Sequence, residues 1–286
     1  ISNIDTDGIY RITCTLVDKA GNAYNAVTLH QADGTPYVTE CTAEDTLVEF
    51  SVNRDGSTFE VDEATKEVLD NYYVYDVKED VVIVEVNANQ LTSNTVSLNG
   101  KELVEGTDFT IATEGGNGAW LRYIYTLNKE LFAEEGEYTI VVSSVDEAEN
   151  NAFSDVKNTK VAFVVDRTAP VVTISGLETN GRYQTDAQTV TLIPTDDGGA
   201  VKSIVVNQVD VEGNVIKTLQ EELSGETLET ALEANDGQIS FVIPSGTYDY
   251  IEIVCADCSV NETGSTNKVE ILIEDVLITE DELALI

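Results

Sequence analysis

The sequence has few of the residues that catalysis and nucleic-acid binding use most. It contains one histidine, His30, no methionine, and 15 basic residues against 53 acidic ones, which gives a formal net charge of −38. One histidine cannot build a histidine metal cluster, and no Gly-x-Ser-x-Gly, P-loop or dinucleotide fingerprint is present. The negative charge repels phosphate backbones and anionic membranes. We therefore expect no enzyme activity and no nucleic-acid partner.

Long hydrophobic runs are also missing. No run approaches the roughly 18 apolar residues that a membrane span needs, so we expect no membrane insertion. Apolar residues still make up 42% of the 286 and charged residues only 24%, which is too apolar a composition for a disordered chain. The sequence therefore predicts a folded chain that is long enough to bury two cores.

One sequence motif occurs three times along the chain: Gly-x-Tyr, an apolar run, then Asp and, a few residues later, Asn. The copies are Gly8, Tyr10, Asp18, Asn22; Gly136, Tyr138, Asp146, Asn150; and Gly246, Tyr248, Asp257, Asn261. The tyrosines lie 128 and 110 residues apart (138 − 10 and 248 − 138), about the length of one immunoglobulin-like sandwich, and a Tyr near a strand start is typical of a tyrosine corner. The repeated motif predicts an all-β chain of tandem immunoglobulin-like β-sandwich domains in an end-to-end array.

The repeats also set the expected domain boundaries. Residues 1–53 are the C-terminal part of a truncated Ig-like domain with an insertion, 54–166 and 167–275 are two complete sandwiches, and 276–286 are a linker or the start of a next module. The lack of methionine and the start almost inside a repeat indicate an internal piece of a longer protein. Within the third segment, the insertion Glu222–Ala234 is the one helix that we expect.

Two stretches resemble a known family of repeats. The joint Phe163-Val-Val-Asp-Arg-Thr-Ala-Pro170 and the turn Asp18-Lys-Ala-Gly-Asn22 are similar to those of bacterial Ig-like repeat domains in large, adhesin-type surface proteins of Gram-positive bacteria. The turn departs from the pattern in the second copy, where Glu149 replaces the glycine, and in the third, where Cys258-Ser-Val260 replaces the middle.

The resemblance implies an extracellular protein on the bacterial cell surface. It favours a non-catalytic stalk or spacer in adhesion. The alternative is a binding module for a host extracellular protein, for example an immunoglobulin or other glycoprotein, or for a glycan.

Calcium is the one metal that the sequence suggests. Calcium takes six to eight hard oxygen ligands, and ions of this kind can stiffen the joints of related repeats. The resemblance therefore implies two ligand sets, one of Asp146, Asn150 and Asp166 and one of Asp18, Asn22 and Asn53. The alternative is that these residues only form left-handed turns and bond their own backbone. The acidic loop Asp196-Asp-Gly-Gly199 lacks EF-hand spacing and is interpreted as a plain turn.

The four cysteines form two pairs in the sequence. Cys14 lies on a predicted strand and Cys41 in the insertion, and we expect a disulfide between them because it would pin the inserted segment to the sandwich. Cys255 and Cys258 form a Cys-x-x-Cys spacing at a strand end. A structural disulfide or free thiols are favoured there over a redox or metal site.

Four aromatic residues are candidates for partner binding. They are Tyr72, Tyr73, Tyr75 and Trp120, of the two residue types that most often anchor interfaces. The alternative is that they fill the end of a sandwich.

Overall fold

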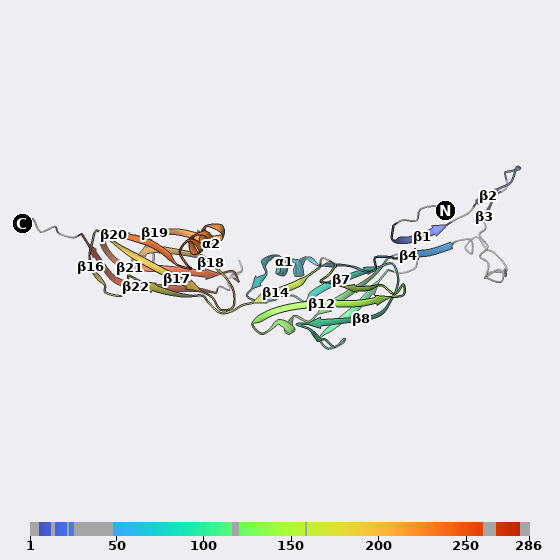
Figure 1. Ribbon diagram of the computed structural model, residues 1–286, viewed down its shortest axis with the longest axis horizontal. Helices are drawn as coiled ribbons and strands as arrows, with labels where there is room; N and C mark the ends of the chain where they lie inside the picture. The colour runs from blue at the N-terminus through green and yellow to red at the C-terminus, as the bar shows by residue number, and fades with distance from the viewer. Residues whose placement is uncertain are drawn as a thin grey trace, which may run out of the picture. The chain divides into compact units, whose positions relative to one another are not determined.

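The computed structural model describes residues 6–12, 15–21, 23–25, 48–115, 120–157, 159–259 and 267–280. The chain divides into two compact units. The first consists of Ile1–Lys66, Asp80–Asn128 and Thr139–Val161, and the second of Glu67–Glu79, Lys129–Tyr138 and Ala162–Ile286. Most described elements are β-strands, with two α-helices among them (Figure 1).

The first repeat contributes four short strands: β1 (Gly8–Ile12), β2 (Thr15–Val17), β3 (Ala23–Asn25) and β4 (Val48–Val52). β1 pairs antiparallel with β4, and β2 with β3. Tyr10 of β1 stacks on Phe50 of β4, with ring centroids 5.5 Å apart. Cys14, Cys41 and His30 lie outside the described residues, so the Cys14–Cys41 disulfide stays a prediction.

Two sheets form from the next part of the chain. One has the order β10-β11-β7-β5, and the other the order β6-β14-β12-β8-β9 with β13 on β12. The elements are β5 (Thr58–Val61), α1 (Glu63–Asn71), β6 (Tyr73–Val74), β7 (Val81–Asn87), β8 (Leu91–Leu98), β9 (Lys101–Glu102), β10 (Phe109–Glu114), β11 (Leu121–Leu127), the 3₁₀ helix η1 (Lys129–Phe132), β12 (Gly136–Asp146), β13 (Asn151–Phe153) and β14 (Val161–Val165).

A second pair of sheets follows. Their orders are β15-β17-β20 and β16-β22-β21-β18-β19. The elements are β15 (Val171–Ser175), β16 (Arg182–Gln184), β17 (Ala187–Thr195), β18 (Val201–Val209), β19 (Val215–Ser224), α2 (Gly225–Ala234), β20 (Ile239–Pro244), β21 (Gly246–Asp257) and β22 (Lys268–Thr279). All are antiparallel neighbours except β16 and β22, which run parallel.

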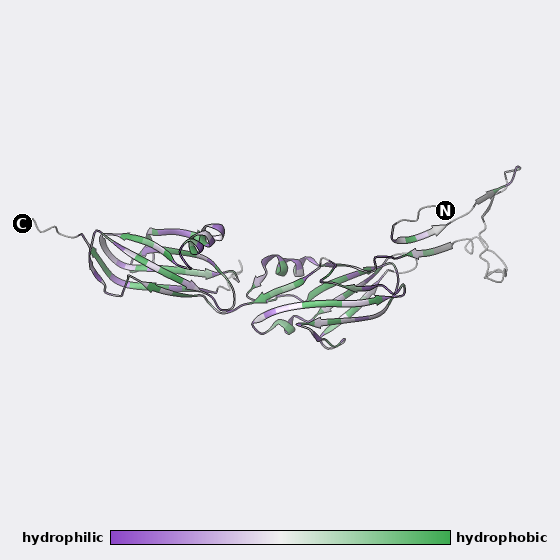
Figure 2. Cartoon of the chain, viewed as in Figure 1, coloured by the Kyte–Doolittle hydropathy of each residue, from purple (hydrophilic) through white to green (hydrophobic). Residues whose placement is uncertain are grey.

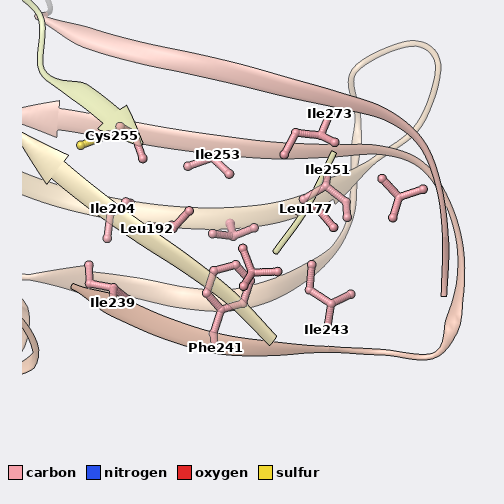
Figure 3. Close-up of a cluster of buried hydrophobic side chains, with 14 of the residues drawn as sticks. Leu177, Leu192, Ile204, Ile239, Phe241, Ile243, Ile251, Ile253, Cys255 and Ile273 are labelled. Atoms are coloured by element: carbon pink, nitrogen blue, oxygen red, sulfur yellow. The ribbon is translucent and has the colours of Figure 1, made fainter. Parts of the chain in front are cut away.

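The cores follow from alternation along the strands. In β21 buried residues alternate with half-buried ones from Ile251 onward, and Ile251, Ile253 and Cys255 have no exposed surface. These side chains face Leu192 and Phe241 of the opposite sheet, as Figure 3 shows. The same alternation appears as changes between hydrophobic and hydrophilic colour along the strands of Figure 2. Burying each large apolar side chain contributes about 1.5–3 kcal/mol, so the two facing layers stabilise the sandwich.

The three repeated tyrosines make the same hydrogen bond. The hydroxyl of Tyr138 donates to the carbonyl oxygen of Glu134 at 2.8 Å, and that of Tyr248 to Pro244 at 2.8 Å. The Tyr10 hydroxyl likewise donates to the carbonyl oxygen of Thr6 at 2.6 Å. Each bond reaches four residues back, which is the tyrosine corner of immunoglobulin-like sandwiches. The fold is therefore all-β and immunoglobulin-like, as the sequence predicts.

Some elements differ from the expectation. Helix α1 is not predicted by periodicity, because it is short and only Thr65 is buried; its start is marked by Asp62, whose side chain accepts the Thr65 amide proton at 2.9 Å. The expected helix Glu222–Ala234 begins later, after β19 ends at Ser224. β19 lies at a sheet edge with exposed apolar residues, so it lacks the alternation that predicts a strand.

The domain boundaries stay predictions. Each sheet described above takes all its strands from one predicted segment, which is 1–53, 54–166 or the part after 167. The last strand, β22, continues to Thr279 beyond the expected end at Asp275, because Val276 and Ile278 belong to the buried core.

Removing one tyrosine-corner hydroxyl should weaken its sandwich. Tyr248→Phe keeps the ring and deletes only the donor to the Pro244 carbonyl oxygen. We expect the free energy of unfolding to fall by about 1 kcal/mol, measured by urea denaturation followed by circular dichroism. Tyr250→Phe on the same strand is the matched control, since its hydroxyl makes no hydrogen bond with any described residue. Equal effects of the two changes would contradict this role.

Candidate functional site

A buried carboxylate closes the turn at the end of β12. Asp146 is 2% exposed and accepts five hydrogen bonds. Its Oδ1 accepts the backbone amides of Ala148 and Asn150, both at 2.9 Å. Its Oδ2 accepts the side-chain amides of Asn53 at 2.7 Å and of Asn87 and Asn150 at 3.1 Å. Both oxygens are therefore supplied with N–H donors.

These donors decide the protonation of Asp146. Burial alone would raise its pKa, but the hydrogen bonds from Asn87, Asn150 and Asn53 outweigh burial and lower the pKa below the usual value. The carboxylate is therefore held as an anion. We call this group, Asn53, Asn87, Asp146 and Asn150, the amide node.

The turn keeps its conformation without the glycine. Glu149 has φ 65°, and Gly21 at the matching position of the first repeat has φ 88°. Gly56 also has a positive φ of 70°, and a Cβ there would lie 2.9 Å from the Cβ of Asn150. The chain therefore needs glycine where the linker passes the node, and tolerates Glu where the turn faces open space.

A second group of carboxylates lies in the second compact unit. Asp166, Asp196 and Asp257 each bring one oxygen to a group whose members lie within 4.8 Å of one another. Asp166 and Asp257 are fully buried, and Asp196 is half-buried. Asp166 follows β14, Asp196 follows β17, and Asp257 ends β21. We call these three residues the aspartate triad.

One oxygen of each triad residue has local donors. Asp166 Oδ1 accepts the amide of Thr168 at 3.0 Å, Asp196 Oδ1 accepts that of Gly199 at 2.8 Å, and Asp257 Oδ1 accepts the Ser259 hydroxyl at 2.6 Å. The other oxygen, Oδ2, is buried in all three residues and has no hydrogen-bond partner among the described residues.

Crowding of carboxylates changes their acidity. Burial, together with the charges of Asp196 and Glu135, raises the pKa of Asp166. Burial, with repulsion from Asp166 and Asp196, raises the pKa of Asp257 to about 6. The pKa is therefore lowered for the one carboxylate of the amide node and raised for Asp166 and Asp257 of the triad. In the triad, the donors to Oδ1 do not outweigh burial and the repulsion between carboxylates.

The two groups occupy matching places in two sandwiches. Asn53 and Asp166 both precede the first strand, and each backbone carbonyl accepts an asparagine side chain, from Asn150 at 3.0 Å and from Asn267 at 2.8 Å. Asn87 ends β7 just as Asp196 follows β17, and both strands pair with the first strand of their sheet. Asp146 and Asp257 both end the tyrosine-corner strand.

The linker residues also have partners on their other side. The backbone amides of Arg54 and Asp55 donate to Asp7 Oδ2, both at 2.8 Å. The amide of Arg167 donates to a carboxylate oxygen of Glu135. Asp7 and Glu135 both come directly before the glycine of a Gly-x-Tyr copy, so the contact repeats at two joints.

The structure regroups the residues that the sequence suggested for calcium. Asp146 and Asn150 meet Asn53, which was expected in the other set, and Asp166 meets Asp196 and Asp257 instead. Each linker residue therefore joins the turn of the sandwich that follows it and not of the one before. Asp18 is exposed and accepts the Ala20 amide at 2.8 Å, while Asn22 lies outside the described residues.

Sequence reasoning missed two members of these groups. Asn87 was not singled out, and Asp196 was interpreted as part of a plain turn. Asn87 is the last residue of β7, and Asp196 directly follows β17. Strand pairing brings them to the linker residues Asn53 and Asp166. Asn87 and Asp196 occupy matching positions at a strand end in the two sandwiches. That match could have identified them, but only with the strand order already known.

The aromatic candidates belong to different compact units. Tyr72 and Tyr73 pack edge to face with centroids 4.9 Å apart, and the Arg167 guanidinium lies 6.0 Å from the Tyr75 ring. These belong to the second unit, whereas Trp120, 37% exposed, belongs to the first. Tyr72 is 43% exposed and has φ 60°, which is uncommon for a bulky residue.

The Cys-x-x-Cys pair has no disulfide. Cys255 is buried and Cys258 half-buried, and both are free thiols. Burial raises the pKa of Cys255 to about 12. The buried thiol is therefore protonated and unreactive at neutral pH.

Comparisons with known proteins identify no family. No protein-family model matches the chain, and no curated protein matches it. Among solved structures, it is similar to fibronectin(III)-like modules of Clostridium thermocellum CbhA, with 12% identity, 74% of this chain and 90% of that chain covered, and a TM-score of 0.30. It is also similar to the N-terminal eight Ig domains of Down Syndrome Cell Adhesion Molecule, with 11% identity, 98% and 32% covered, and a TM-score of 0.22.

These likenesses are too weak to carry an argument. The assignment of an immunoglobulin-like sandwich therefore stands on the sheets and tyrosine corners described above. Within the described residues, neither helix has the length and apolar character of a membrane span.

The amide node should make stability depend on acid. Because the pKa of Asp146 is lowered on folding, its contribution is present above the usual pKa near 4 and is lost as the pH falls through the lower, folded value. We expect Asp146→Asn to lower the free energy of unfolding by about 2–3 kcal/mol at pH 7, and the difference from the unchanged chain to shrink below pH about 4. Urea denaturation at several pH values measures it.

Asp155→Asn is the matched control, since Asp155 is exposed in the same compact unit. It should leave stability nearly unchanged at every pH. A loss for Asp146→Asn that stayed constant down to pH 3 would contradict the assigned charge state.

Proposed function

We propose that this chain is a non-catalytic Ig-like segment of a bacterial surface protein, and that it acts outside the cell as a stalk or spacer in adhesion. The observation that carries this proposal is the repeated attachment of the linker residues on both sides. The resemblance of the joint and turn sequences to bacterial surface repeats supports the location, and the fold supports a module that repeats and does not catalyse.

The first joint shows both attachments. The Asn53 side chain donates to Asp146 and Asn87, and its carbonyl oxygen accepts Asn150. One residue later, the Arg54 amide donates to Asp7. Successive linker residues are therefore bonded to the repeat that follows and to the repeat that precedes.

The second joint repeats the arrangement with different side chains. The carbonyl oxygen of Asp166 accepts Asn267, and its amide donates to the Val74 carbonyl oxygen at 2.9 Å. The Arg167 amide donates to Glu135, and its guanidinium donates to Asp76 at 3.0 Å. A linker with specific partners at each residue lacks the conformational freedom of a flexible, Gly/Ser-rich linker. A spacer requires such a restrained linker.

A binding module is the second candidate. It is favoured by the exposed, positive-φ Tyr72, because strained backbone at an exposed aromatic residue is common where a ligand is held. In this reading, Tyr72, Tyr73 and Tyr75, or Trp120, anchor a host protein or glycan.

The linker attachment can be tested by backbone dynamics. We expect the Arg167 amide to show an NMR order parameter near that of rigid strands, about 0.85, and Glu135→Ala to lower it toward about 0.6, because the acceptor of that amide is deleted. Glu134→Ala is the matched control, since its exposed neighbouring carboxylate does not bond the linker in the described structure. A mobile Arg167 amide in the unchanged chain would count against the spacer.

The two candidate functions differ in what the chain binds. We expect immobilised chain to retain no host extracellular protein and no glycan from an array, because a spacer only positions other domains. If a partner is retained, Tyr72→Ala and Trp120→Ala are compared with Phe153→Ala, an equally exposed aromatic residue at 46% exposure. Loss of that partner in Tyr72→Ala alone would replace the spacer by the binding module.

A further inference from the structure

The aspartate triad carries three negative charges where the amide node carries one. In the node, two side-chain amides, Asn53 and Asn87, donate to the single carboxylate of Asp146. In the triad, the matching positions are Asp166 and Asp196, and a carboxylate cannot donate a proton to Asp257 when ionised. The same fold therefore replaces two internal donors by two additional acceptors.

The triad also has unused acceptors in a buried place. In the part of the chain that the structure describes, Oδ2 of Asp166, of Asp196 and of Asp257 are all buried without a hydrogen-bond partner. Two of these side chains have 0% exposure. A buried polar atom without a partner costs free energy, and more so when it is charged. Three such atoms in one group point to a ligand that the protein itself does not supply.

The loop after β17 passes very close to the carboxylate of Asp166. A Cβ on Gly199 would collide with Asp166 Oδ2 and would lie 3.5 Å from the Tyr73 ring. Gly198 has the same role, since its Cβ would lie 2.5 Å from Asp166 Oδ1. The loop can therefore approach the Asp166 carboxylate this closely only because two successive residues are glycines.

We propose that Asp166, Asp196 and Asp257 bind one calcium ion. The donor set is all oxygen and carries three negative charges, which suits a hard divalent cation and excludes a preference for zinc, whose structural sites use thiolate and imidazole. Calcium fits better than magnesium because it accepts bidentate carboxylates and irregular geometry, whereas magnesium requires a near-ideal octahedron. The site differs from both ligand sets that the sequence suggested.

The amide node then explains why the other sandwich needs no ion. Its side-chain amides occupy the oxygens that a cation would otherwise bind. The chain contains the same joint in two chemical forms, one closed by hydrogen bonds and one closed by a cation. This proposal does not depend on the spacer role, since a calcium-dependent joint would serve a binding module equally.

The test is calcium binding and thermal stability of the whole chain. After removal of metals with a chelator, we expect isothermal titration with calcium to show one site occupied at millimolar calcium or below. Calcium should raise the melting temperature by several degrees, because it binds only the folded state. No binding and no shift at about 5 mM calcium, several-fold above the dissociation constants of extracellular calcium modules, would overturn the proposal.

A double variant separates loss of the site from loss of the fold. Asp166→Asn with Asp196→Asn copies the amides of the node, so we expect at least 10-fold weaker calcium binding and no calcium shift. In chelator, this variant should melt at or above the temperature of the unchanged chain, because the repulsion between carboxylates is gone. A full calcium shift in the double variant would overturn the proposal.

Two controls locate the ion. Asp249→Asn removes an equal charge from an exposed residue of the same strand as Asp257 and should leave the calcium response unchanged. Asp146→Asn in the amide node should also keep the response, and its loss there would move the site to that node. A shift that magnesium reproduces at the same concentration would overturn the choice of calcium.

Discussion

A buried carboxylate at the end of the tyrosine-corner strand is the group around which each sandwich closes its linker end. Asp146 and Asp257 sit at the same place, and both are out of contact with solvent. A buried anion without partners is costly, so the surrounding chain must supply donors or positive charge. The residues that reach it come from the linker and from the second strand of the facing sheet, and so this requirement fixes the linker to the sandwich.

The two sandwiches meet the requirement differently. In the first, neutral amides donate to one carboxylate, and the group is complete within the protein. In the second, three carboxylates meet, and their buried Oδ2 atoms have no partner in the described structure. Exchanging Asn for Asp at two positions changes only one atom of each side chain. The exchange replaces a hydrogen-bond donor by an acceptor, so the site then needs a cation in place of the amide donors.

Another buried carboxylate shows that the protein supplies hydrogen-bond donors to such groups elsewhere. Glu85 is fully buried in β7, and it accepts hydrogen bonds from the hydroxyls of Ser57, Ser144 and Tyr125. Burial and the neighbouring Glu85 raise the pKa of Tyr125 far above its usual value, so the tyrosine stays protonated and donates. Against this background, the unpartnered oxygens of the triad are an exception that asks for a ligand.

The sequence by itself determined the fold class and most of the strands. Alternation of apolar and polar residues in stretches such as Leu121–Leu127 and Ile239–Ile243 predicts which side chains face the core. The Gly-x-Tyr motif predicts the tyrosine corner because that hydrogen bond spans only four residues. The elements α1 and β19 were missed because neither has a regular pattern of buried apolar residues in the sequence.

Only the tertiary structure decided which polar residues meet. Asn53 and Asp146 are 93 residues apart, and their contact depends on strand order and register, where a slip of one residue would turn a side chain to the other face. Local patterns could therefore name Asn53, Asp146, Asn150 and Asp166 as candidates. They could not find Asn87 and Asp196, or assign each linker residue to the sandwich that follows it.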